Sequence, residues 1–450
     1  MRFTGQSRLV SSLLNERVSS TFRALRHRNF RLFFAGQFIS LTGTWMQSVA
    51  QSWLVYRLTG SVVLLGLVGF ASQIPVFLLA PLGGAVADRF NRHRILMVTQ
   101  SAAMVLAFIL AYLTLSEKIE IWHLFVIASG FGIANAFDIP TRQAFAVDLV
   151  GREDLINAIA LNSSMFNGAR IVGPAIAGIL VAAVGEGWCF LGNAVSYSAV
   201  LTGLVMMRIT PVVRPRAGST ISNIVEGFRY VAFTKPIRAL LLLLGLVSLM
   251  GMPYAVLMPI FADQILGGGP DTLGFLMGAS GLGALTAALV LASRKSVFGL
   301  GRWVSIACAS FGLSIGLFSF SSNFWLSLVL LFPVGFFMMT QMSASNTLVQ
   351  SMVPDELRGR VMSVYSMMFM GLAPIGALLA GTLAEAVGAP ATVMIGGIAC
   401  ILGAVVFKLK AKGFREEGRA MIVSMQMTGG EPAAKGAFQL SIHTSQTDKE

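Results

Sequence analysis

The chain has 450 residues, of which 55% are hydrophobic and only 12% are charged, and its mean hydropathy is +0.75. A soluble globular domain carries about a quarter of charged residues, so the composition excludes that class and indicates a protein embedded in a lipid bilayer. The net charge of +13 would suggest nucleic acid binding in a soluble protein. Here its distribution along the chain gives it another meaning.

Twelve apolar runs are each long enough to cross about 30 Å of hydrocarbon as a helix. Six lie on each side of a polar central segment, which predicts an all-α membrane protein with twelve transmembrane helices in two six-helix bundles. The expected spans are 33–56, 62–86, 95–115, 121–139, 157–183, 188–207, 238–262, 272–292, 303–320, 324–346, 361–384 and 391–408.

The spans predict five segments along the chain. These are a cytoplasmic N-terminal segment (1–31), an N-terminal bundle (32–207), a cytoplasmic central loop with an interfacial helix (208–236), a C-terminal bundle (237–410) and a flexible cytoplasmic tail (411–450).

Lys and Arg segregate to one side of this arrangement. Of the 33, all but Arg57, Lys118 and Arg170 fall in the tails and the even-numbered connections. Basic residues are enriched in cytoplasmic loops, so we expect both termini in the cytoplasm. Because one missed helix would scramble the pattern, the segregation also favours twelve spans.

The first span carries a polar stripe at three- and four-residue steps in an otherwise apolar helix. Such a stripe lines a cavity or forms hydrogen bonds to a neighbouring helix, and both interpretations stay open. The stripe comprises Ser40, Thr44, Gln47, Ser48 and Gln51. As candidate substrate-binding residues from the spans we take Thr44, Trp45, Gln47, Gln51, Arg170 and Gln341.

The connection after the second span reads GGAVADRFNRHRIL, with Gly84, Asp88, Arg89 and Arg92 at a fixed spacing. It resembles the cytoplasmic signature of the major facilitator superfamily, from which Asn91 departs by replacing a glycine. An Asp held at a helix end can engage backbone amides and a facing Arg. We therefore predict a conformational latch at these residues.

The fourth span ends in FDIPTRQAF, which contains Asp138 and Arg142. Asp138 is the candidate proton carrier, and the alternative is that it pairs with Arg142 or Arg89 as part of the latch.

Arg170 is the one charge deep within a span. Because a charge at the bilayer centre costs at least about 3 kcal/mol, Arg170 must face the bundle interior. A water-filled cavity with an anionic or strongly polar ligand is one interpretation, and a structural role bonded to carbonyl groups is the other.

An internal repeat links the two halves. The sequence SSMFNGARIVGPAIAG at 163–178 reappears 203 positions later as SMMFMGLAPIGALLAG. Repeats of this kind are typical of secondary transporters, in which two halves rock around a central site.

Together these segments resemble the transmembrane secretion effector branch of the major facilitator superfamily, which includes enterobactin-type siderophore exporters. Gly173 and Pro174 are similar to the fifth-helix motif of its antiporters. The resemblance implies a monomeric, multi-pass transporter of the bacterial inner membrane that exports a small molecule in exchange for protons. Gly173 and Pro174 of this motif and Arg142 of the FDIPTRQAF segment join the residues expected to control conformation.

The sequence contains no phosphate-binding loop, metal-ligand cluster or nucleophile motif. We therefore expect no enzyme activity, cofactor or metal, and no nucleic acid partner. The predicted function is export of a small amphiphilic, siderophore-like or drug-like molecule by alternating access. A lipid or lysolipid flippase with the same fold and a uniporter of a polar metabolite are the alternatives.

Overall fold

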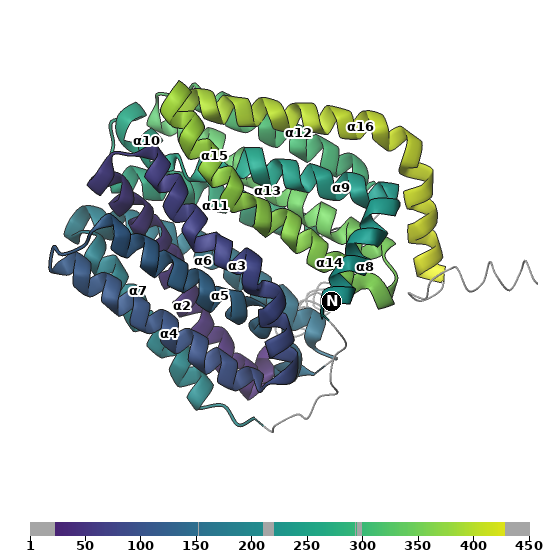
Figure 1. The fold of residues 1–450 in the computed structure, drawn as a ribbon, viewed down its shortest axis with the longest axis horizontal. Coiled ribbons are helices and arrows are strands. Elements are labelled where there is room, and N and C mark those ends of the chain that lie inside the picture. Colours follow the sequence, from purple (N-terminus) through teal and green to yellow (C-terminus); the bar gives the residue numbers. More distant parts are fainter. Residues whose placement is uncertain (1–22, 152, 210–219, 293, 295–298, 428–450) are drawn as a thin grey trace, which may run out of the picture. The chain divides into compact units, whose positions relative to one another are not determined.

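A computed structural model describes residues 23–151, 153–209, 220–292, 294 and 299–427, and all regular secondary structure in these ranges is helical. Contacts within the chain define two compact units (Figure 1). Unit 1 comprises Met1–Gly60, Ile74–Ala217 and Ala262–Gly278, and unit 2 comprises Ser61–Gln73, Gly218–Phe261 and Ala279–Glu450. The units therefore share two helices, since α3 and α11 each contribute one part to each unit.

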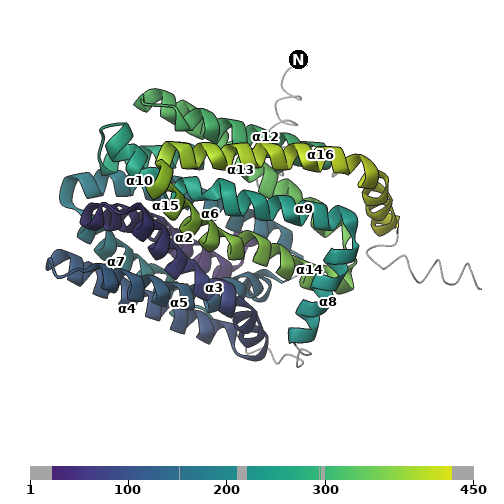
Figure 2. The same ribbon diagram turned by 45° about the horizontal axis from the view of Figure 1, so that its top comes forward.

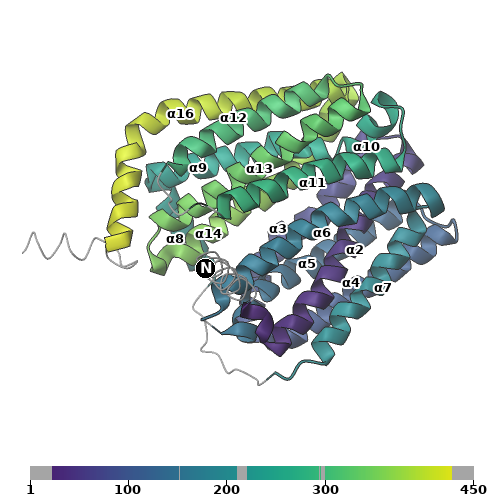
Figure 3. The same cartoon turned by 180° about the vertical axis from the view of Figure 1, so that it is seen from behind.

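Unit 1 is a layered bundle in which α2 packs along α6 and α7, and α4 packs along α5 and α7 (Figure 3). Its core is built from aromatic and aliphatic side chains such as Phe30, Phe33 and Phe145, which are almost fully buried. Its helices are α2 (Arg28–Thr59), α3 (Val62–Arg89, from Ile74 onward), α4 (Arg92–Leu115), α5 (Ile121–Val150), α6 (Leu155–Val184), α7 (Glu186–Val205) and the start of α11 (Pro270–Ala292).

In unit 2, α12 packs along both α13 and α16 (Figure 2). Alongside the first part of α3 and the end of α11, its helices are α8 (Thr220–Phe233), α9 (Lys235–Leu246), α10 (Met258–Ile260), α12 (Leu300–Ser319), α13 (Phe324–Met352), α14 (Asp355–Ser366), α15 (Leu372–Val387) and α16 (Ala389–Met427).

Eleven helices within the described residues are long and apolar enough to cross a membrane. They correspond in order to the second through twelfth predicted spans. The first predicted span is also helical, as α2, and its 32 residues are ample for a crossing. Its Gln, Ser and Thr residues lower its hydropathy, which is why it is absent from the eleven. The count of twelve spans thus remains a prediction.

The seventh span is not one regular helix. Between Lys235 and Ile265 the chain passes through α9, a π-helical turn at Val247–Gly251, a 3-10 turn at Met252–Ala255, α10 and a second π-helical turn at Phe261–Ile265. The 3-10 turn and α10 contain Pro253 and Pro259, which lack the amide hydrogen that a regular helix requires.

The last helix also extends further than the sequence indicates. α16 continues to Met427, past residue 411, where we predicted a flexible tail, and Figure 1 shows its final part turning away from the rest of the helix. In this final part Ile422 is only 6% exposed, and Gly418 lies against Met352 and Pro236 of unit 2. This packing explains why a segment with little apolar pattern is helical. The predicted tail beyond Met427 lies outside the described residues.

Two glycine contacts allow helices to approach closely at equivalent points of the repeat. In unit 1, a Cβ atom added to Gly274 of α11 would lie 2.6 Å from the carbonyl oxygen of Pro174 in α6. In unit 2, a Cβ atom added to Gly66 of α3 would lie 2.6 Å from the carbonyl oxygen of Ala377 in α15. Pro174 and Ala377 are separated by the 203 positions of the sequence repeat. Small residues permit such contacts between membrane helices.

We predict that Gly274→Ala lowers the thermal stability of the purified protein. The added methyl group would meet a backbone carbonyl that cannot move aside, and overpacking of this kind costs about 1–3 kcal/mol. This cost exceeds the gain of up to about 1 kcal/mol that Ala brings to a helix. Gly278→Ala is the matched control, because Gly278 lies one turn further along α11 with nothing within 4 Å of the added atom. Equal melting temperatures for the two variants would contradict the prediction.

Candidate functional site

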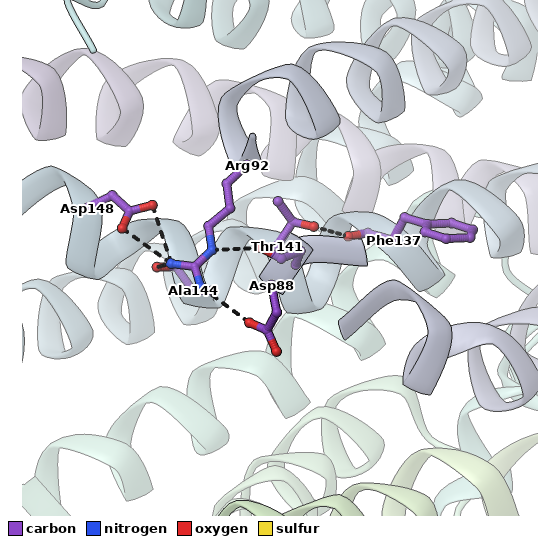
Figure 4. A network of polar contacts seen from close by, with 7 residues as sticks. Asp88, Arg92, Phe137, Thr141, Ala144 and Asp148 are labelled. Carbon is purple, nitrogen blue, oxygen red and sulfur yellow. Dashed lines mark hydrogen bonds and ion pairs between the residues drawn. The ribbon is translucent and has the colours of Figure 1, made fainter. Parts of the chain in front are cut away.

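The signature after α3 is organised around Arg92, whose side chain is only 12% exposed (Figure 4). Its Nε atom donates to the carbonyl of Ala87 at the end of α3. Its Nη1 atom donates to the carbonyl of Ala144, at 2.8 Å, and to the carboxylate of Asp148, at 3.3 Å, both in α5. One guanidinium therefore joins the ends of three helices, α3, α4 and α5, because its five donors can engage several acceptors at once.

The other predicted residues of this signature contribute less within unit 1. Asp88 lies 3.5 Å from Arg92 and is 53% exposed, so solvent weakens this ion pair. Arg89 is exposed at the end of α3. Gly84 has no neighbour that a side chain would meet, whereas a Cβ atom on the adjacent Gly83 would collide with the carbonyl oxygen of Ala136. The close approach of α3 to α5 thus depends on Gly83, which the motif did not single out.

Asp138 is buried in α5 and is surrounded by hydrogen-bond donors. One carboxylate oxygen lies 2.7 Å from Nη2 of Arg142, one turn further along the helix. The other accepts hydrogen bonds from Gln100 at 2.7 Å and from Thr99 at 3.1 Å, both in α4. Of the partners considered from the sequence, the structure pairs Asp138 with Arg142. The ion pair lies within α5, whereas the hydrogen bonds from Thr99 and Gln100 hold α5 against α4. Whether Asp138 also exchanges protons stays a prediction.

The polar stripe of α2 divides between two environments. Gln47 is 5% exposed, and its side-chain oxygen accepts a hydrogen bond of 2.7 Å from Asn193 in α7. Thr44 donates to the carbonyl of Ser40 and lies 3.5 Å from the hydroxyl of Tyr197, also in α7. Gln51 is half-buried. For Gln47 and Thr44 the structure thus shows bonding within α2 and toward α7, which was one of the two interpretations of the stripe.

Arg170 lies at the middle of its span, thirteen residues after Asn157 and fourteen before Val184. Its guanidinium carbon is 5.8 Å from the ring centroid of Trp45 in α2, within the range of a cation–π contact. The Trp45 ring meets Phe166 edge-to-face, with centroids 5.7 Å apart. Arg170 and Trp45 are half-buried and Phe166 is 46% exposed. The three side chains form a cationic, aromatic cluster, here called the Arg170 cluster.

Gly173 fixes the position of this cluster. A Cβ atom at Gly173 would lie 2.5 Å from the Cβ atom of Trp45 and 2.8 Å from the carbonyl oxygen of Thr42. α6 can therefore reach α2 closely only because residue 173 has no side chain. The structure gives the Gly173 and Pro174 motif a packing role, since Pro174 contacts Gly274 in the same unit.

Gln341, the one predicted site residue from unit 2, lies in α13 and is fully buried. Neither its side-chain nitrogen nor its side-chain oxygen has a hydrogen-bond partner.

Sequence reasoning did not identify several partners of these residues. Asp148, Asn193, Phe166, Thr99 and Gln100 are separated in sequence from the side chains that they contact. The one sequence signal for Asn193, Thr99 and Gln100 is that each is a polar residue within an apolar span. Among the described residues no group of three His, Cys, Asp or Glu side chains is placed to hold a metal ion.

Comparison with known proteins identifies the relatives of this chain. Residues 19–432 match the family model of transmembrane secretion effectors. The chain is 28% identical to the staphyloferrin A transporter of Staphylococcus aureus, over 85% of this chain and 97% of that protein. It is 27% identical to the multidrug efflux pump Tap of Mycolicibacterium fortuitum, over 78% and 88%. It is 25% identical to the enterobactin exporter EntS of Escherichia coli, over 79% and 85%.

Solved structures of transporters share the fold. The nucleoside transporter NupG superimposes with a TM-score of 0.65 at 14% identity, covering 86% of this chain and 98% of that one. A POT family transporter bound to a thioalcohol-conjugated peptide gives a TM-score of 0.68 at 12% identity, covering 86% and 96%. At these identities the likeness concerns the fold alone.

From the Arg92 geometry we predict that Arg92→Gln lowers stability more than Asp88→Asn. Arg92 loses hydrogen bonds to two carbonyls and a carboxylate, and a bond to a charged group contributes about 1.5–3 kcal/mol. Asp88→Asn removes only an exposed ion pair, worth up to about 1 kcal/mol. The check is thermal unfolding in detergent, with the exposed Arg94→Gln as control. A larger loss in Asp88→Asn would show that the latch depends on that carboxylate.

Proposed function

The chain belongs to the transmembrane secretion effector family of the major facilitator superfamily, and from this membership we propose that it exports a small amphiphilic molecule by alternating access. Membership makes it a multi-pass transporter of the inner membrane and not an enzyme. The named substrates and functions of its relatives support siderophore-like or drug-like cargo, because these relatives are two siderophore transporters and a multidrug pump.

The Arg170 cluster is the observation that carries the substrate proposal. A guanidinium at the middle of a span cannot face lipid without a cost of at least about 3 kcal/mol. Arg170 is nevertheless only half-buried, and Trp45 and Phe166 beside it are also partly exposed. We infer that this surface lines the transport path. A guanidinium next to aromatic rings suits a ligand that combines a negative or electron-rich group with an apolar body.

Of the remaining predicted contacts, Trp45 and Gln51 suit this role best, since both are half-buried. Gln47 and Thr44 act through α7, where their bonds to Asn193 and Tyr197 hold α2 in place. We therefore propose that Gln47 and Thr44 position α2 and do not contact the substrate themselves.

Proton antiport is the proposed energy source, with Asp138 as the candidate carrier. Asp138 is buried in α5, and protonation would remove the negative charge that pairs with Arg142 in the same helix and would weaken the hydrogen bonds that Asp138 accepts from Thr99 and Gln100 of α4. We propose that Arg142 controls the interconversion of states together with Gly84, Asp88, Arg89, Arg92, Gly173 and Pro174.

The proposed topology has twelve spans, both termini in the cytoplasm and a monomeric assembly. The helix α2, added to the eleven apolar helices, supports a total of twelve spans. The segregation of Lys and Arg supports the cytoplasmic location of both termini. The paired contacts of Gly274 with Pro174 and of Gly66 with Ala377 support the internal repeat.

We predict that Arg170→Ala and Arg170→Lys both reduce export at least about tenfold, which corresponds to about 1.4 kcal/mol. Lys keeps the charge but loses the planar fork of five donors, so it should not rescue transport. The measurement is export by proteoliposomes of metal-free enterobactin, staphyloferrin A and ethidium, with membrane abundance in parallel. Arg294→Ala is the control, because Arg294 also lies over a tryptophan ring, Trp303 at 4.7 Å, but outside the spans.

Export at the wild-type rate by Arg170→Ala would remove Arg170 from the substrate site. Failure of that variant to accumulate in the membrane would assign Arg170 a structural role. Transport of labelled lipid, in place of the three probes, would favour the flippase alternative.

For proton coupling, we predict that Asp138→Asn abolishes substrate accumulation driven by a pH gradient and retains exchange driven by substrate alone. Asn can keep the hydrogen bonds to α4 but cannot release a proton. Both modes are measured in the same proteoliposomes. Glu120→Gln is the matched control, since Glu120 is an exposed acid at the opposite end of α5. Gradient-driven accumulation that persists in Asp138→Asn would exclude Asp138 as the carrier.

A further inference from the structure

Two polar side chains on one face of α13 are buried without partners. Gln341 and Ser345 lie one helical turn apart, and each is 0% exposed. The amide nitrogen and oxygen of Gln341 and the hydroxyl oxygen of Ser345 all lack a hydrogen-bond partner in the structure. Buried polar groups in proteins are almost always paired, because an unpaired group loses its hydrogen bonds to water and forms none within the protein. This pair therefore requires an explanation.

The repeat shows what occupies the same place in unit 1. A shift of 203 positions aligns Gln341 with Asp138 and Ser345 with Arg142, and it also aligns Gly335 with Gly132. In unit 1 the two positions hold the Asp138–Arg142 ion pair. That pair is completed by donors from the neighbouring helix, so the position is polar and satisfied.

In unit 2 the neighbouring helix offers no such donors. α12 packs along α13, but two of its polar side chains bond to α16: Ser305 donates to the carbonyl of Ala404, and Cys308 donates to the carbonyl of Cys400. Gln341 and Ser345 thus carry buried polar atoms that form no hydrogen bond within the part of the chain that the structure describes.

We propose that Gln341 and Ser345 form a neutral hydrogen-bonding subsite for the exported molecule. A side-chain amide offers donors and an acceptor together, and a hydroxyl adds one of each. The matching ligand group also carries both, as a carboxamide or a hydroxy acid does. The inference rests on the proposed export function and extends it to a second, uncharged recognition element besides Arg170.

Access to this subsite requires movement of the helices around it, since both side chains are sealed from solvent in the present conformation. Met338 lies one turn before Gln341 on the same face of α13 and is 2% exposed. Methionine is flexible and adapts to irregular neighbours, so it can yield as a ligand group enters. The cost of the unpaired amide in the closed conformation also favours its opening, which a transporter that cycles between states can use.

The test compares Gln341→Met with Gln47→Met. Both replace a buried glutamine by an apolar side chain of similar length, but Gln47 is paired with Asn193. We expect Gln341→Met to keep or raise the melting temperature and to reduce export of metal-free enterobactin and staphyloferrin A at least tenfold. Gln47→Met should lower the melting temperature, because it leaves the Asn193 amide unpaired.

Export at the wild-type rate by Gln341→Met overturns the subsite. A fall in its melting temperature as large as that of Gln47→Met also overturns it, because Gln341 would then be a structural residue. If Gln341→Met does not accumulate, Ser345→Ala decides, since it removes only an unpaired hydroxyl: reduced export supports the subsite and unchanged export overturns it. If the wild-type protein exports neither probe, both the proposed function and the subsite are wrong. If the wild-type protein exports the probes and the variants export them at the same rate, only the subsite is wrong.

Discussion

A charge or an amide buried between membrane helices must find a partner, because neither lipid nor packed side chains can replace water around it. Unit 1 meets this requirement in three ways. At one end of the bundle, Arg92 donates to helix-end carbonyls and a carboxylate. Within α5, Asp138 and Arg142 neutralise each other. At the middle of α6, Arg170 rests over an aromatic ring. The Arg92 contacts and the hydrogen bonds from α4 to Asp138 bind helices together, whereas the contact of Arg170 with Trp45 lies on a partly exposed surface.

Close helix contacts provide the frame in which these pairs are held. Small residues let α6 approach α2 at Gly173 and α11 at Gly178, so backbone meets backbone with no intervening side chain. Packing of this kind replaces the hydrophobic effect, which cannot drive helices together where the solvent is itself apolar. The same residues that bring α6 to α2 also set the distance between Arg170 and Trp45. Packing and the candidate substrate site are therefore not separable in this part of unit 1.

The two units treat one repeat position differently. Asp138 in unit 1 has a counter-charge and two further donors, whereas Gln341, 203 residues later, has none. The chain thus carries different chemistry at two positions 203 residues apart, a charged pair in α5 and a neutral amide in α13.

The sequence by itself determined the features that depend on local composition. Apolar runs predicted the spans, and the loop signature and the repeat predicted the family. Arg170 could be singled out as a candidate site residue because it is the one charge deep within an apolar span. The tertiary structure decided which polar residues pair across helices. Periodicity places Gln47 and Gln341 on a helix face, but the helix opposite supplies Asn193 for one and no donor for the other. It also decided that α16 continues to Met427, where Gly418 lies against Met352 and Pro236, two residues distant in sequence. Such partners come together only on folding, so no local pattern could reveal them.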